Sequence, residues 1–204
     1  MHEVTPTRSA ALELADERKL MRQGYEFLDE KRTLLASEML RQLRLYQERA
    51  DALDEAMKRA SAALAAAVER HGLDGVQVYP APQPLQLPDN TRSLFLGITM
   101  LATGPASPAA RDTPAAVDSS PEAKACRAAF DELLVLAADI GVRNGNLQRL
   151  AREYRRTERR AQALEKVLLP EVEEAIKRVD EQLDTMEREE TIRTRWAHKP
   201  AVSG

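Results

Sequence analysis

The sequence predicts an all-α protein, a long antiparallel two-helix coiled coil with a small irregular or short β-hairpin connector segment. Charged residues make up 31% of the 204 residues and aromatic residues only 4%. Strong helix formers such as Ala, Glu, Arg and Leu dominate the composition, whereas the aromatic and turn residues of a barrel or sandwich are scarce. Apolar residues also recur in alternating steps of three and four, which is the pattern of paired helices.

The chain is expected to form one elongated domain in three parts. Residues 1–72 form an N-terminal long helix, residues 73–119 a Pro- and Ala-rich connector with room for a short β-hairpin, and residues 120–204 a C-terminal long helix and tail. About 65 helical residues in the first part would span roughly 100 Å, at about 1.5 Å per residue. A single globular domain of this size cannot contain such a helix, so the two helices are expected to pair as an antiparallel coiled coil.

The first helix has recognisable start and stop residues. Pro6 stands between two threonines, so a hydroxyl cap lies beside a proline with a preset helical φ, and Gly72 is a typical residue just past a helix end. Between them an apolar stripe predicts the line of contact with the second helix. It comprises Leu14, Met21, Leu28 and Leu35, spaced by seven, then Met39, Leu43, Tyr46, Ala50, Leu53, Met57, Ala60, Leu64 and Ala67.

The connector cannot continue the helix because it is rich in proline. Val76, Gln77, Val78 and Tyr79 alternate apolar and polar residues, and residues 93–101 are apolar and tolerant of β structure, so a two-stranded element is expected here. Residues 103–119 are rich in Ala, Pro and Ser and are expected to form a mobile loop.

The second helix is expected to begin at a capping box, with Ser119 as N-cap, Glu122 three residues later and Pro121 in the first turn. Gly141 to Gly145 predicts a bend or short break. A second apolar stripe follows, interrupted by Pro170, where a kink is expected. This stripe consists of Leu147, Leu150, Tyr154, Thr157, Ala161, Leu164, Leu168, Val172, Ala175, Val179, Leu183 and Met186.

Charges on the second helix are arranged in blocks. Residues 143–160 contain seven arginines and two glutamates, residues 165–190 contain ten acids and four bases, and residues 191–199 contain three bases and no acid. Blocks of one sign indicate different neighbours at different heights along the helix. Nucleic-acid binding by the arginine block is disfavoured, because the net charge of the chain is −3 and the only aromatic residue in the block is Tyr154.

The residues required for catalysis or cofactor binding are not recognisable in this sequence. No phosphate-binding loop or glycine-rich dinucleotide fingerprint is found, and the three histidines stand far apart at segment ends, so neither a cofactor nor a metal is expected. The single cysteine, Cys126, is interpreted as a structural thiol. No apolar run is long enough to insert into a membrane, and no secretory signal is visible, so a cytoplasmic location is expected.

Several motifs, in order, resemble the D subunit of the V-type and archaeal-type ATPases. The start, Val4-Thr5-Pro6-Thr7-Arg8 followed by Leu12 and Leu14, is similar to the start of that family, and so are residues 28–35, LDEKRTLL. In the second helix, residues 156–165, RTERRAQALE, resemble the family stretch R-R-x-N-A-L-E, with Gln162 where asparagine is usual. Leu168-Leu169-Pro170 supplies the in-helix proline, and residues 187–193, EREETIR, resemble a block near the family's C-terminus.

The resemblance implies a noncatalytic central-stalk subunit, the rotor shaft of a V/A-type rotary ATPase or ATP synthase. Such a shaft couples ATP hydrolysis or synthesis in a catalytic ring to proton or sodium transport across the membrane. The implied partners are the nucleotide-binding A and B subunits of the ring, the small F subunit and the C/d subunit that couples to the membrane ring. The implied location is peripheral, on the cytoplasmic side of the membrane as part of the complex, with no partnership with nucleic acid.

The resemblance also gives candidate contact residues. The end of the helix pair that enters the ring, called the tip here, would comprise Pro6, Thr7 and Arg8 with Arg188, Arg193, Arg195 and Lys199. Trp196 is expected to pack on Pro6 or Leu12 across the tip. The family-motif positions on the helices are Lys31, Arg32, Arg159, Arg160, Leu164, Glu165 and Pro170.

A free-standing coiled-coil chaperone or adaptor of the prefoldin type is the alternative hypothesis. Proteins of that type hold clients with exposed apolar helix tips. The tip of this chain carries arginines, which disfavours the alternative.

Overall fold

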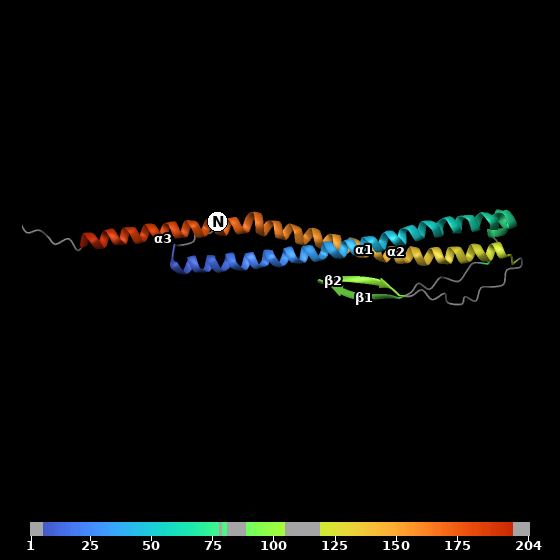
Figure 1. Ribbon diagram of the computed structural model, residues 1–204, viewed down its shortest axis with the longest axis horizontal. Helices are drawn as coiled ribbons and strands as arrows, with labels where there is room; N and C mark the ends of the chain where they lie inside the picture. The colour runs from blue at the N-terminus through green and yellow to red at the C-terminus, as the bar shows by residue number, and fades with distance from the viewer. Residues whose placement is uncertain (1–5, 78, 81–88, 105–118, 198–204) are drawn as a thin grey trace, which may run out of the picture. The chain divides into compact units, whose positions relative to one another are not determined.

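The computed structural model describes residues 6–77, 79–80, 89–104 and 119–197. Its elements are helix α1 (Arg8–Gln77), strands β1 (Asn90–Phe95) and β2 (Ile98–Thr103), helix α2 (Pro121–Ala163), a π-helical turn η1 (Leu164–Leu168) and helix α3 (Leu169–Ala197) (Figure 1). The predicted fold class, two long helical segments with a small β-hairpin between them, is confirmed. The chain divides into two compact units, Met1–Leu34 with Arg155–Gly204, and Leu35–Tyr154.

Both long helices start at hydroxyl caps next to a proline. The backbone N–H of Ala10 donates to Thr7 Oγ1 at 3.1 Å, so the predicted start of α1 is confirmed. In α2 the cap is Ser120 and not the predicted Ser119, because Ala123 N–H donates to Ser120 Oγ at 3.1 Å. Pro121 takes the first helical position, so the residue directly before it becomes the cap and Glu122 falls one position short of a capping box.

Gly72 produces a local break in α1. Its φ of 70° and ψ of 167° are non-helical, while the residues up to Gln77 remain assigned to the helix. The prediction of a strand over residues 76–79 is therefore wrong for Val76 and Gln77; Val78 lies outside the described residues, and Tyr79 is not in a strand. Tyr79 is instead used at the start of α2, where its hydroxyl accepts a hydrogen bond from Ser120 N–H at 3.2 Å.

The β-hairpin contains the predicted apolar run 93–101. Strands β1 and β2 pair antiparallel, with Phe95 opposite Ile98 at the turn. The two turn residues, Leu96 and Gly97, have φ values of 48° and 85°, the positive angles of a type I′ turn, which matches the twist of the strands. The predicted loop over 103–119 falls largely on residues 105–118, which lie outside the described residues.

In the unit Leu35–Tyr154 the two helices run antiparallel. Arg49 Nε lies 3.2 Å from Asp139 Oδ2, and Arg59 Nη2 lies 2.7 Å from Glu132 Oε1. The hairpin supplies the apolar contact that the helices alone lack, since Ile98 and Met100 of β2 form a buried cluster with Leu35 and Leu150. Met39, Phe95 and Tyr154 pack against this cluster.

The contact line of α1 differs from the predicted stripe at three positions. Leu43, Met57 and Leu64 are 42%, 50% and 38% exposed, respectively. The residues buried on α1 are Leu35, Gln42, Ala56, Ala60 and Ala67, so Leu43 and Met57 each stand one position away from a buried residue. Alanine at the contact lets the helix backbones approach closely, which leaves no room there for the larger side chains.

Helix α2 runs without a break through Gly141 and Gly145, so the predicted bend is wrong. The surrounding residues maintain the helix, because Asn146, buried to 3% exposure, and the fully buried Leu150 pack it against the rest of the unit. Tertiary packing thus overrides the low helix propensity of glycine.

In the unit that contains both chain ends, the start of α1 runs antiparallel to α3. Arg8 Nη2 lies 2.7 Å from Glu187 Oε1, and a Cβ placed on Gly24 would lie 3.7 Å from Leu164 Cδ1. The second predicted stripe is largely confirmed here. Thr157, Ala161, Val172 and Val179 are buried, and Leu164, Ala175 and Leu183 are half-buried, whereas Leu168 and Met186 are exposed.

At Pro170 the departure from regular helix is a π turn directly before the proline. Leu169 N–H donates to Leu164 O, five residues back, and both flanking residues keep helical angles. A proline lacks the N–H for the next bond and its ring crowds the preceding turn, so the wider π turn accommodates it within a helix that continues as α3.

Candidate functional site

The predicted tip brings together the start of α1 and the last part of α3. The guanidinium of Arg8 donates to the Glu187 carboxylate at 2.7 Å, and this hydrogen bond raises the pKa of Arg8. Beyond this contact α3 continues past the beginning of α1 (Figure 1). All residues of α3 from Asp184 to Trp196 are exposed, including the predicted contact residues Arg188, Arg193 and Arg195. Lys199 lies outside the described residues.

The side chains of Trp196 and Leu12 are 74% and 69% exposed, so close packing of Trp196 on Leu12 is not observed, and packing on Pro6 stays a prediction. Because α3 extends past the start of α1, Trp196 lies more than two turns beyond the Arg8–Glu187 pair along the helix. Together with Ile192, 55% exposed, it leaves apolar surface on an otherwise charged helix end.

The family-motif positions in this unit fall into two kinds. Leu164 is half-buried beside Gly24, and the charge of Glu165 raises the pKa of Tyr25 on α1, so these two residues contribute to helix pairing. Arg159 and Arg160 are instead exposed, together with Arg155 and Arg156, and no ion pair is found for these four arginines within the described residues. Arg32 Nη2 lies 2.6 Å from Asp29 Oδ1, an ion pair within the helix surface. Lys31 is half-exposed, and Pro170 is exposed.

In the other unit, two polar residues of α2 hold the hairpin in place. Leu101 N–H donates to Asn146 Oδ1 at 2.9 Å, and Asn146 Nδ2 donates to Leu101 O at 2.6 Å, so the amide pairs with the backbone of β2 as a neighbouring strand would. Thr103 Oγ1 donates to Asp139 Oδ1 at 2.9 Å, while Asp139 Oδ2 lies 3.0 Å from Arg143 Nε. We did not predict either residue's role from the sequence, although an asparagine on the core side of a helix is a signal that could have indicated one.

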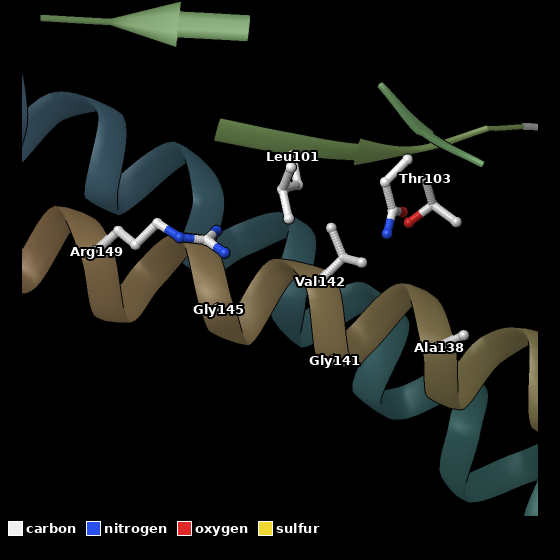
Figure 2. Close-up of a pocket in the computed structure, with 8 residues that line it drawn as sticks. Leu101, Thr103, Ala138, Gly141, Val142, Gly145 and Arg149 are labelled. Carbon is white, nitrogen blue, oxygen red and sulfur yellow. The ribbon is translucent and has the colours of Figure 1, made fainter. Parts of the chain in front are cut away.

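Between β2 and α2 lies a groove of about 330 Å³ (Figure 2). Leu101 and Thr103 point toward α2 from one side, and Gly141 and Gly145 line the helix surface below them. The guanidinium of Arg149 extends over Gly145, and its Nη1 donates to Asn146 Oδ1 at 2.9 Å. The full lining is Asn90, Leu101, Thr103, Ala138, Gly141, Val142, Gly145 and Arg149.

A family model that describes the D subunit of ATP synthase matches residues 10–199. This chain belongs to the ATP synthase D subunit family. It is 30% identical over 199 residues to the V-type ATP synthase D subunit of Anaeromyxobacter dehalogenans (strain 2CP-C), which covers 96% of this chain and 95% of the relative. It is 31% identical over 198 residues to the A-type ATP synthase D subunit of Thermococcus gammatolerans, with 93% and 91% covered. The identity to the V-type ATP synthase D subunit of Thermotoga neapolitana is 26% over 200 residues, with 93% and 94% covered.

Membership of the ATP synthase D subunit family confirms the family predicted from the motifs. The chain is therefore a noncatalytic central-stalk subunit of a V/A-type rotary ATPase or ATP synthase, in which ATP turnover is coupled to ion transport. The prefoldin-type alternative finds no support in the comparisons.

Within the described residues, no group of three or more His, Cys, Asp or Glu side chains could hold a metal ion. Cys126 is half-buried, and burial raises the pKa of its thiol, which keeps it protonated and poorly nucleophilic at neutral pH. Among the helices described, none is long and apolar enough to cross a membrane.

Proposed function

We propose that the tip is the end of the protein that turns inside the ring of nucleotide-binding A and B subunits. The observation that carries this proposal is the exposed end of α3. From Asp184 to Trp196 the helix has no buried residue, yet Arg188, Arg193 and Arg195 are spaced along it with no ion pair found within the described residues. A helix end that is charged, extended and exposed along this whole length fits insertion into a surrounding partner.

A rotor tip has to satisfy two opposing requirements. Its contacts must keep it centred, but none may be so strong that one ring position is preferred over the others and rotation stalls. Exposed arginines meet both requirements when they face acidic loops, because such pairs are weak individually and are readily exchanged. Ile192 and Trp196 add a small apolar surface at the same helix end.

The remaining partners of the complex are assigned to other surfaces. We propose that a second part of the ring faces the exposed arginines Arg159 and Arg160, together with Lys31 and Arg32. The small F subunit binds beside the helix pair. The coupling C/d subunit binds the unit that contains Gly72 and Ser120. The same assembly would hold the chain peripherally on the cytoplasmic side of the membrane. The π turn at Pro170 would act as a torsional element between two regular helices.

Charge reversal at the tip tests the proposal directly. In the reconstituted complex, the double variant Arg193→Glu and Arg195→Glu is expected to retain stoichiometric assembly but to lower ion transport per ATP hydrolysed several-fold, because like charges would then face the acidic loops. The matched control is Lys177→Glu with Arg178→Glu, which makes the same charge change earlier on α3. Unchanged coupling in the tip variant would contradict the assignment, as would an equal loss in the control.

A tagged pull-down of the full chain from native membranes tests the partner set. We expect the A, B, F and C/d subunits in constant ratio when the bound chains are identified by mass. Recovery of scattered client proteins would contradict the assigned partners.

A further inference from the structure

We propose that the π turn η1 is a conformational switch, which converts to α-helix and thereby rotates α3 about its own axis. The proposal rests on the function proposed above, because it supplies a mechanism for the torsional element assigned there. It depends on three features of the unit that contains the chain ends: the extra residue that the π turn accommodates, two apolar lines along the helix, and a proline that favours one helix form over the other.

The π turn sets the alignment of the contact residues on its two sides. Leu164 is half-buried beside Gly24 of α1, and the buried Val172 follows it by eight residues. In a regular α-helix eight residues overshoot two full turns by roughly 80°. The wider π turn takes up about one residue, so Val172 stays close to the line of Leu164. The form of this one turn therefore decides which side of α3 contacts α1.

Two apolar lines run side by side along this part of the chain. In the first, Val172 and Val179 are 8% and 4% exposed, and the half-buried Leu183 follows them. The second consists of Leu168 and Met186, which are 38% and 54% exposed. These two are eighteen residues apart, about five whole turns of α-helix, and their line lies roughly 40° from the first. Either line can face α1, and the π form buries the first.

Conversion of the π turn to α-helix would exchange the two lines. It gives back the residue that the π turn takes up, so α3 would rotate by roughly 100° relative to the end of α2. An apolar contact stripe is about 100° wide, so this rotation is large enough to bring Leu168 and Met186 toward α1 and to move Leu183 away. The exposed arginines of the tip would turn with α3, while the two helices stay paired.

Pro170 determines the balance between the two forms. In an α-helix it has no N–H to donate to the carbonyl of Lys166, and its ring would crowd that carbonyl. In the π form Leu169 N–H donates to Leu164 O, five residues back, and the turn widens directly before the proline. A π turn is otherwise the rarer and less favourable form of helix. The cost of proline in the α form thus opposes the cost of the π turn, which keeps the two forms close in free energy.

Hydroxyl-radical footprinting of the full chain tests the switch, because mass spectrometry then reports the exposure of the native Leu168, Leu183 and Met186 side chains. Pro170→Ala removes the penalty on the α form. It is expected to lower the modification of Leu168 and Met186 at least about threefold and to raise that of Leu183. The matched control is Glu173→Ala, at an exposed position of the same helix, which should leave all three unchanged.

A second variant returns the contact line to its original side. Deleting Val167, which is 49% exposed within the π turn, leaves seven residues between Leu164 and the valine that now follows at the eighth position. Combined with Pro170→Ala, the deletion should restore the wild-type modification of Leu183 and Met186, because a regular α-helix then keeps the first line on α1. Failure of this rescue would count against the rotation.

Thermal unfolding followed by circular dichroism separates rotation from loosening of the helix pair. Pro170→Ala should keep or raise the thermal midpoint, because alanine favours helix. Higher modification of all three side chains with a lower midpoint would overturn the switch, as would a footprint identical to that of the wild type. Either result would leave the tip assignment intact, since the charge reversal of Arg193 and Arg195 tests that assignment separately.

Discussion

The two units use the same helix pair but differ in what holds the helices together. In Leu35–Tyr154 the hairpin adds a third layer, and Leu35 and Leu150 are fully buried against Ile98 and Met100. In the unit with the chain ends, none of the described residues of α1 from Arg8 to Leu34 is buried, and the buried residues of the opposite helix are the small or medium-sized Thr157, Ala161, Val172 and Val179.

The difference shows what a two-helix arrangement lacks. Two helices in contact cover only one stripe of each other, so large side chains at their interface stay partly exposed unless a third element covers them. The unit with the hairpin has such an element, and the unit with the tip does not. We therefore expect the first unit to dominate the stability of the isolated chain, and the second to gain most of its stability from partners that bind the folded state.

The largest expected effect comes from truncating the core that the hairpin completes. Leu150→Ala should lower the free energy of unfolding by roughly 2–5 kcal/mol, because a fully buried leucine leaves a cavity between three elements. Val179→Ala, at a position 4% exposed in the other unit, removes two methyl groups from a thinner interface and should lower it by about 1–2 kcal/mol.

Urea denaturation followed by circular dichroism measures both losses, and hydrogen exchange shows which unit opens. An equal or larger loss for Val179→Ala would show that the two-helix unit is as well packed as the one with the hairpin, and the comparison would fail.

A smaller effect is expected when the attachment of the hairpin is removed. Asn146→Leu keeps a side chain of similar size but deletes both hydrogen bonds to Leu101, at a cost of roughly 1–3 kcal/mol. Amide exchange in β2 should accelerate more than exchange in α1. Asn144→Leu, at an exposed position on the same helix, is the control and should leave exchange in β2 unchanged. Equal protection of β2 in both variants would show that the apolar cluster alone holds the hairpin.

Sequence periodicity predicted the elements better than the exact contact line. The heptad Leu14, Met21, Leu28 and Leu35 lies on the contact side, since the first three are half-buried and Leu35 is fully buried. Leu43 and Met57 were assigned by hydrophobicity, but the contact is made one position away by smaller or polar residues such as Gln42 and Ala56. Hydrophobicity alone does not indicate how closely the backbones of two helices approach, and this distance decides which side chains fit at the contact.

The features missed in the sequence depend on contacts between distant residues. Whether a helix continues through Gly141 and Gly145 depends on the packing of Asn146 and Leu150, which local propensity cannot show. The pairing of Asn146 with Leu101 joins residues 45 positions apart. The tip was located because antiparallel pairing of the two long helices puts Pro6 beside the C-terminal tail, and the Arg8–Glu187 pair agrees with that placement.

The smallest expected effect is a pH dependence specific to the unit with the hairpin. The carboxylate of Glu38 accepts two hydrogen bonds from Arg41, at 2.7 and 2.6 Å, and one from the buried Gln42 at 2.8 Å. The bonds from Arg41 are the main cause that holds the pKa of Glu38 below its ordinary value of 4.5. Since the folded-state pKa is the lower one, this stabilisation is present above about pH 4.5 and is lost as the pH falls through the folded-state pKa.

Glu38→Gln should therefore reduce the fall in the free energy of unfolding between neutral and acid pH. At pH 7 it should lower the free energy of unfolding by about 0.5–1.5 kcal/mol, because the Glu38 side chain is only 13% exposed. Urea denaturation at about pH 7 and about pH 3.5 measures both quantities. Glu55→Gln removes the carboxylate of a pair with Lys58 in which the two side chains are 63% and 71% exposed, so it serves as the control and should change neither quantity measurably. If both variants lost the same stability at neutral pH, the bonds to Arg41 and Gln42 would contribute no more than an ordinary surface pair, and the polar side chains beside the core would not add to the difference between the two units.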